Sequence, residues 1–122
     1  MTEWQKELSG NFKRHGVLPV TGSFGVESVK GGKYHPLSSG ECCVIGAALI
    51  GHECRHSDAF AVDFGLVHNK TIEYTVGLVA GWDDRGSGDV RTDIYDYEVG
   101  FRDGVAVRSW QVGLISGAGV KS

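Results

Sequence analysis

Two pairs of glycines limit the folds that are open to this chain of 122 residues. Gly77 and Gly81 lie four positions apart, and so do Gly100 and Gly104. Residues at this spacing share one face of a helix, so each pair would give its helix a flat strip on which a second backbone can approach closely. A glycine inside a helix costs about 0.5–1 kcal/mol relative to alanine, and close packing must compensate for that loss. The pairs therefore predict two tightly packed helices.

Most of the remaining glycines fit two further roles. Glycine contributes 19 of the residues, more than twice its usual share of about 7%. Those between Gly22 and Gly32, with Gly86 and Gly88, are typical of turns. Four others follow apolar segments where a helix would stop: Gly16, Gly51, Gly65 and Gly113. Gly10, Gly40 and Gly46 fit neither role.

Apolar spacing and capping residues predict where the first helices lie. Trp4, Leu8 and Phe12 recur every four residues and indicate a helix over residues 3–15. Ser38 and Glu41 match a capping box, which predicts that a helix begins there and continues as a buried apolar helix over residues 42–50. Leu37, just before the cap, would act as a hydrophobic staple.

Three more helices are expected in the second half of the chain. Ser57 precedes an apolar segment over residues 59–64, and Asn69 precedes a longer one over residues 70–82. In the longer helix Ile72, Val76 and Val79 share one face, and a second apolar face lies beside it, so we expect burial on two sides. The last helix follows the acidic residues 93 and 96 and ends near residue 112.

These patterns predict a mainly α fold, a compact bundle of four or five helices. Residues 17–36 form a glycine-rich loop or a short β-hairpin after the first helix, with the turn at residues 30–33. An α+β fold is the alternative, because residues 72–79 and 105–112 contain β-branched side chains. The length suits one domain spanning residues 1–122, in which residues 113–122 would be a flexible tail.

Charge and cysteine content narrow the expected partners and the compartment. The net charge is −3 and the chain contains no basic run, so nucleic acid is not the expected partner. No apolar run reaches the roughly 18 residues of a membrane span, and the first residues do not resemble a signal peptide. Of three cysteines, Cys42 and Cys43 are adjacent, which favours reduced thiols over a disulfide scaffold. We therefore expect a cytoplasmic protein that does not associate with membranes.

The sharpest chemical motif is His52-Glu53-Cys54-Arg55-His56, which matches the H-E-x-x-H pattern. On a continuous helix, two histidines one turn apart bind Zn²⁺ and the glutamate activates water as a general base. One alternative is therefore a small zinc-dependent hydrolase, with His52 and His56 as metal ligands and Glu53 as the catalytic residue.

The flanking residues argue against that alternative. Gly51 is typical of a helix end and Ser57 of a helix start, so the five residues between them are expected to be a polar linker. Arg55 would also place a positive charge beside the metal. A third ligand would have to come from His68, Asp63 or Glu73. We therefore expect no cofactor, with Zn²⁺ as the alternative.

A second alternative is a helix-turn-helix DNA-binding protein. Residues 61–72 have the outline of helix, glycine turn and helix. However, the second helix begins with Lys70 and Glu73 and has no arginine for base or phosphate contacts. A helical hairpin that packs into the core fits the segment better.

Three small-and-apolar segments carry a family resemblance. Residues 45–51, 77–83 and 97–104 resemble segments of small helical accessory proteins of phages and other mobile elements, such as integron cassettes. The resemblance implies a binding or adaptor role and brings no catalytic residues with it. Our leading hypothesis is therefore a non-enzymatic protein-interaction or adaptor module. It would bind a protein partner or self-associate through Trp4, Leu8 and Phe12, provided that its own core does not use this stripe.

Overall fold

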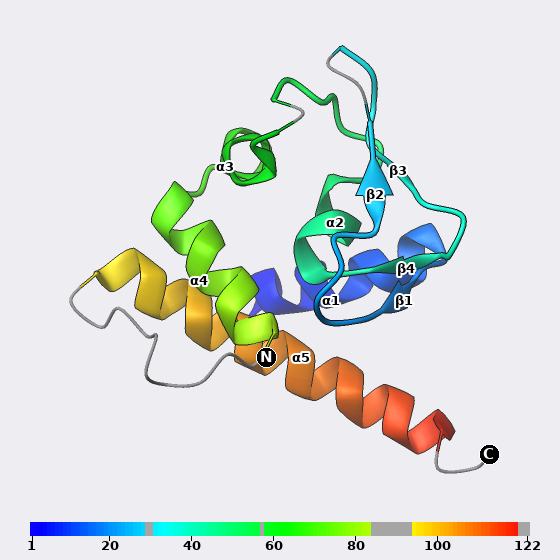
Figure 1. Cartoon of the computed structure of the whole chain (residues 1–122). Coiled ribbons are helices and arrows are strands. Elements are labelled where there is room, and N and C mark those ends of the chain that lie inside the picture. Colours follow the sequence, from blue (N-terminus) through cyan, green and yellow to red (C-terminus); the bar gives the residue numbers. More distant parts are fainter. Residues whose placement is uncertain (29–30, 57, 84–93, 120–122) are drawn as a thin grey trace.

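The computed structural model describes residues 1–28, 31–56, 58–83 and 94–119, with the side chains of the last helix as far as Gln111. These parts of the chain contain five helices and two small two-stranded sheets, which confirms a mainly α fold. Figure 1 shows the longest helix, α5 (Tyr95–Gly119), with α4 (Ile72–Trp82) along its N-terminal half. Within the described ranges, no helix is long and apolar enough to cross a bilayer.

Helix α1 (Glu3–His15) forms where the apolar stripe predicts it. Thr2 caps its start in a capping box with Gln5, in which each side chain bonds the backbone N–H of the other residue. Gly16 ends the helix in the left-handed conformation at φ 67°. The prediction for this helix and its stop is confirmed.

The glycine-rich segment after α1 contains the predicted hairpin and a second sheet. Strands β2 (Val26–Glu27) and β3 (His35–Pro36) pair antiparallel. Strands β1 (Leu18–Pro19) and β4 (Glu41–Cys42) pair in parallel, which the sequence pattern does not indicate. Gly25 lies where the two sheets meet, and a Cβ atom on it would come within 2.0 Å of the Glu41 carbonyl oxygen.

The expected capping box at Ser38 and Glu41 is wrong. Residues 38 and 39 form a turn, and the backbone N–H of Leu18 bonds the Gly40 carbonyl oxygen at 2.8 Å. Pairing with β1 therefore keeps residues 41 and 42 extended, and Leu37 is exposed instead of acting as a staple. Helix α2 (Val44–Leu49) starts later, where the Cys43 sulfur accepts the Gly46 N–H. Its residues are all buried, as the apolar run predicts.

The boundary between α3 (Phe60–His68) and α4 also differs from the prediction. Gly65 is not a stop, because α3 continues through it and ends at Asn69, which adopts φ 56°. Asparagine tolerates this left-handed conformation better than most residues. Thr71, rather than Asn69, caps α4 with its side-chain oxygen. Gly65 has another role, since a Cβ atom there would lie 2.4 Å from the Lys70 carbonyl oxygen in the connection.

Helices α4 and α5 meet through the four paired glycines, as their spacing predicts. A Cβ atom on any of them would clash with a backbone carbonyl oxygen of the other helix. The distances from that atom to the oxygen are 2.2 Å for Gly77 to Tyr97, 2.2 Å for Gly81 to Phe101, 2.1 Å for Gly100 to Tyr74 and 2.3 Å for Gly104 to Leu78. The segments that allowed a strand interpretation, residues 72–79 and 105–112, are helical.

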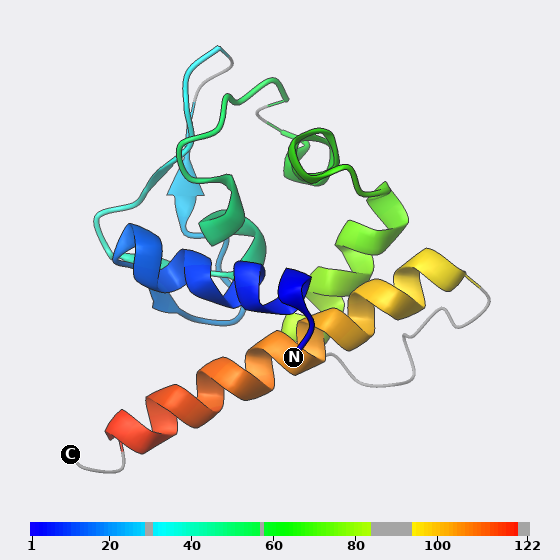
Figure 2. The same cartoon turned by 180° about the vertical axis from the view of Figure 1, so that it is seen from behind.

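The last helix is longer than expected. The predicted end near residue 112 is wrong, because α5 continues to Gly119, while the flexibility expected of residues 113–122 stays a prediction. A single glycine such as Gly113 weakens a helix without ending it. In Figures 1 and 2 the C-terminal half of α5 extends beyond the rest of the molecule. The features expected at Ser57, Gly86, Gly88 and Asp93 lie outside the described residues.

The core lies between α1, α2 and the α4–α5 pair. The Trp82 ring stacks on Phe12 with 5.4 Å between centroids, and its Nε1–H donates to the Val20 carbonyl oxygen at 2.7 Å. On the other side of the core, Trp4 donates to the Tyr74 hydroxyl at 2.6 Å, and that hydroxyl donates to Asp103. These contacts hold α1 against both helices of the glycine-paired unit.

Candidate functional site

The segment with the H-E-x-x-H motif is a loop and does not form a helix. It runs beside residues 31–34, and Glu53 forms a bridge with Lys33. Four backbone hydrogen bonds join these two segments, from Gly51 to Tyr34, from Tyr34 to His52, from Gly31 to Cys54 and from Cys54 to Gly32, naming the donor first. These bonds use backbone groups that a helix would need for itself. The expected polar linker is confirmed.

The three motif residues consequently point to different partners. The His52 ring lies edge-on to His68 with 5.7 Å between centroids, whereas His56 bonds Asp63 at 2.8 Å. Glu53 pairs with Arg55 at 3.3 Å. No group of three or more His, Cys, Asp or Glu side chains in the described part of the chain is placed to hold a metal ion. The zinc-hydrolase alternative thus lacks the helix on which the motif depends.

Asp63 on α3 organises this loop. Its side chain is 1% exposed and accepts four hydrogen bonds, from the Tyr34 hydroxyl at 2.7 Å, the Arg55 N–H at 3.0 Å, the His56 N–H at 3.1 Å and His56 Nδ1 at 2.8 Å. Burial favours the neutral acid, but these donors hold the pKa of Asp63 below its usual value. Burial and the bond to Asp63 raise the pKa of Tyr34. Asp63 therefore stays ionised and fastens the loop to α3.

A half-buried histidine, His68, lies next to this loop. His68 Nε2 lies 3.1 Å from the Ala48 carbonyl oxygen, and the ring packs against Trp4 and Phe64. Burial lowers the pKa of His68, and burial also lowers that of His15 at the end of α1. Folding therefore favours the neutral form of both rings.

The stripe Trp4, Leu8 and Phe12 is part of the core. Leu8 is 0% exposed and Phe12 is 3% exposed, while Trp4 is half-buried and bonded to Tyr74. The condition for self-association through this stripe therefore fails. The physical reason is that α2 and α4 cover the same helix face that the spacing marks as apolar.

A different apolar surface is exposed on α3 and α4. Ile72 and Val76 are 50% and 47% exposed, and Val79 is half-buried one turn further on. The shared face of these three residues follows from the helical spacing, but the expected burial of α4 on two sides is wrong. Phe60, at the start of α3, is 36% exposed and was not indicated by the pattern. We call Phe60, Ile72, Val76 and Val79 the outer face.

Two hollows join the outer face to the loop before β2. One, of about 190 Å³, is lined by Phe60, Thr75, Val76 and Val79 among others. The second, of about 170 Å³, shares Phe60 and Val79 with the first and reaches Phe24. The centroids of the Phe24 and Phe60 rings lie 4.7 Å apart, and both rings line the second hollow.

The charged side chains that the structure describes at the edge of the outer face are acidic. Glu73 directly follows Ile72 and Asp58 lies two residues before Phe60, and both acidic side chains are exposed. Asp83 lines the second hollow, where it accepts the Gly22 N–H at 3.0 Å. Lys70 points elsewhere, because its ammonium lies over the Trp4 and Tyr74 rings. The surface is therefore apolar at its centre and negative at its edge.

The helix-turn-helix outline is present as the hairpin of α3 and α4. The exposed side of α4, which a groove-binding helix would use, carries Ile72, Glu73 and Val76. Helix α4 contains no lysine or arginine for phosphate contacts. The α3–α4 hairpin thus fits a helical hairpin that packs into the core better than it fits a DNA-binding motif.

Comparisons with protein-family models, with curated proteins and with solved structures find no match for the chain.

Proposed function

We propose that this protein is a non-enzymatic interaction module that binds a partner protein through the outer face. The observation that carries the proposal is the exposure of Ile72 and Val76 in line with the hollow between Phe60 and Val79. Contiguous apolar surface with a polar edge is characteristic of protein-interaction sites. Burying two half-exposed aliphatic side chains and a phenyl ring would supply the apolar centre of such an interface.

The charge distribution indicates the chemistry of the partner. Glu73, Asp58 and Asp83 border an apolar centre, so a partner segment with apolar side chains and flanking lysines or arginines is complementary to it. An amphipathic helix suits the surface, because its apolar side chains can enter the two hollows in succession. We place this function in the cytoplasm, supported by three free and buried cysteines that suit a reducing compartment.

The test uses two synthetic amphipathic helices as probes, with leucines on one face and either lysines or glutamates on the other. Titration calorimetry is expected to show saturable binding of the lysine peptide and weaker binding of the glutamate peptide. Val76→Asn should reduce the affinity for the lysine peptide by about tenfold. Val105→Asn on α5 is the matched control, because this valine is 39% exposed on a different helix.

Two results would overturn the proposal. Equal affinity of the two peptides would remove the charge argument, and equal effects of the two valine substitutions would remove the outer face as the site. Sedimentation of the parent protein distinguishes a second copy of the chain as the occupant. A dimer that Val76→Asn dissociates would replace the partner protein with self-association through this face.

A further inference from the structure

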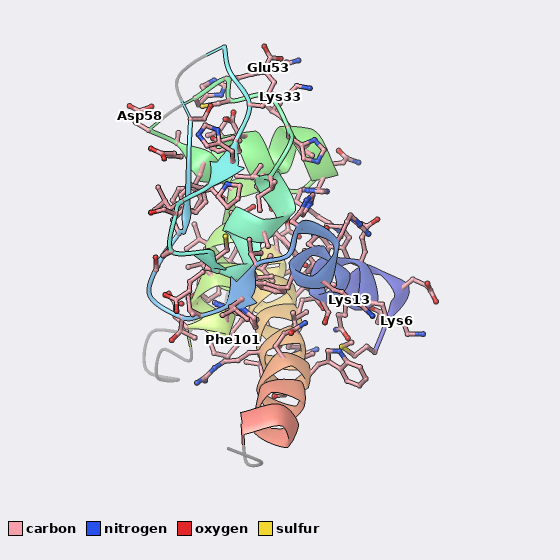
Figure 3. All side chains as sticks on the ribbon, turned by 90° about the vertical axis from the view of Figure 1, so that its right-hand side faces the viewer. Lys6, Lys13, Lys33, Glu53, Asp58 and Phe101 are labelled. Atoms are coloured by element: carbon pink, nitrogen blue, oxygen red, sulfur yellow. The ribbon has the colours of Figure 1, made fainter. Side chains whose placement is uncertain are left out.

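A cavity lies between α1 and α5. It measures about 350 Å³ and is lined by Lys6, Gly10, Phe12, Lys13, Trp110 and Gln111 among others. Small-molecule sites begin near this size, at about 300 Å³. Figure 3 shows Lys6 and Lys13 on α1, the helix that forms one wall.

Gly10 differs from the other helical glycines whose surroundings the structure describes. A Cβ atom on Gly46, Gly65 or any of the four paired glycines would lie within 2.4 Å of a backbone oxygen. At Gly10 the same atom would meet nothing within 4 Å. Close packing within the chain therefore explains why the other helical positions carry glycine, but it does not explain the glycine at position 10. The space above Gly10 belongs to the cavity instead.

The cavity has an apolar interior and a positive edge. Phe12 is 3% exposed at its inner side, and Trp110 is 49% exposed at its outer side. Lys6 and Lys13 flank Gly10 at positions −4 and +3, so all three lie on the same side of α1. Lys6 pairs with Glu3 at 3.7 Å, but both side chains are exposed, so this pair is weak and exchangeable.

The polar groups at the base of the cavity are already paired. Gln111 is buried, and its amide nitrogen donates to the Ser9 carbonyl oxygen at 3.0 Å and to the Ser9 hydroxyl. These bonds fix one wall of the cavity and join α1 to α5. Among the described side chains that line the cavity, Lys6 and Lys13 are the charged ones.

We propose that this cavity binds a small amphipathic anion, an aryl or alkyl carboxylate or sulfonate. The apolar body lies between Gly10, Phe12 and Trp110, and the anionic group lies near Lys6 and Lys13. The size suits a body of one or two rings, since a cavity of about 150 Å³ already accepts benzene. This site is separate from the outer face, which is formed by α3 and α4.

The test measures binding of 2-naphthoate by titration calorimetry, with the neutral 2-naphthylmethanol as a charge control. Gly10→Leu fills the cavity and should weaken 2-naphthoate binding by at least about tenfold. Gly10→Ala is the matched variant, because it gives α1 a similar gain in helix propensity and adds only a methyl group, and it should bind within about threefold of the parent. Both substitutions favour the helix, so loss of folding would not account for a loss of binding.

The double substitution of Lys6→Gln with Lys13→Gln separates the anionic group from the apolar body. It should weaken 2-naphthoate by about tenfold and leave 2-naphthylmethanol unchanged. Three results would overturn the proposal: no saturable binding of 2-naphthoate at about 1 mM, undiminished binding to Gly10→Leu, or equal affinity for the charged and neutral compounds.

Discussion

Helix α5 contacts two other helices in opposite ways. Against α4 its glycines bring backbone to backbone, so a Cβ atom on Gly100 would lie 2.1 Å from the Tyr74 carbonyl oxygen. Against α1 it uses side chains, including the bond from Gln111 to Ser9, and a cavity of about 350 Å³ remains over Gly10. Paired glycines four apart thus indicate close approach of helices, whereas a lone helical glycine can instead leave open space.

The difference between the two contacts of α5 bears on both proposed binding sites. The α4–α5 pair is closely packed because each of the four glycines faces a backbone oxygen of the other helix, and this leaves the opposite side of α4 free to expose Ile72 and Val76. The α1–α5 contact is looser in its packing and leaves the space in which we place the anion. The two proposed sites therefore depend on opposite uses of the same residue type.

The largest effect is expected where the backbones meet. Gly100→Ala would force a methyl group against the Tyr74 carbonyl oxygen and the Leu78 nitrogen. Overpacking of this kind exceeds the gain in helix propensity, so the free energy of unfolding should fall by about 2–3 kcal/mol. Urea denaturation measures it. An unchanged or higher stability would show that α4 and α5 do not approach as closely as described.

Substitution of Gly10 by alanine should change the free energy of unfolding in the opposite direction. Because nothing lies within 4 Å of the added atom, Gly10→Ala should raise the free energy of unfolding by about 0.5–1 kcal/mol through helix propensity alone. The same denaturation experiment tests it, with Gly100→Ala as the contrast. Destabilisation at both positions would mean that α1 and α5 are in closer contact than the cavity indicates.

The smallest expected effect is a pH dependence of the free energy of unfolding that comes from His68, whose ring packs against Trp4 of α1. Burial and the neighbouring His52 and Lys70 lower the pKa of His68, although the Ala48 carbonyl oxygen and Glu7 act in the opposite direction. The unfolded chain therefore binds a proton more readily than the folded one. The contribution of His68 is fully present above the unfolded pKa of about 6.5 and is lost as the pH falls below it.

His68→Gln tests this dependence while keeping a side-chain donor for the Ala48 carbonyl oxygen. Urea denaturation at pH 8 and at pH 5 should show that the parent loses more stability than the variant. His15 is present in both proteins and also has a lowered pKa, so the difference between them isolates His68. Equal losses would show that His68 titrates alike in the folded and unfolded chains.

The parts of the fold that were predictable are those with local causes. The spacing of Trp4, Leu8 and Phe12 and the stop at Gly16 fix α1 without reference to the rest of the chain. Ser38 and Glu41 have the right local pattern for a helix start, yet they are drawn into a turn and a strand by β1. A capping box is worth about 1 kcal/mol, which a few strand hydrogen bonds and core contacts can exceed.

The candidate sites likewise combine features that local sequence patterns predict with features that depend on tertiary packing. The pattern of Ile72, Val76 and Val79 correctly groups one face of α4, but which apolar face is covered depends on where α5 packs. His52 and His56 match a zinc motif by spacing alone, and pairing of their segment with residues 31–34 removes the helix that the spacing assumes. The sequence suggests Asp63 only as a possible third metal ligand, and its role in holding that loop depends on Tyr34, which lies 29 residues away in the sequence.

By itself, the sequence determined the helical class of this protein, its first helix and the close contact of two helices, because glycine spacing and apolar periodicity act within a few turns. Only the tertiary structure decided which glycine faces a backbone and which faces a cavity, and which apolar stripe stays exposed. Those outcomes depend on what another segment places opposite a residue, and a sequence position does not contain that information.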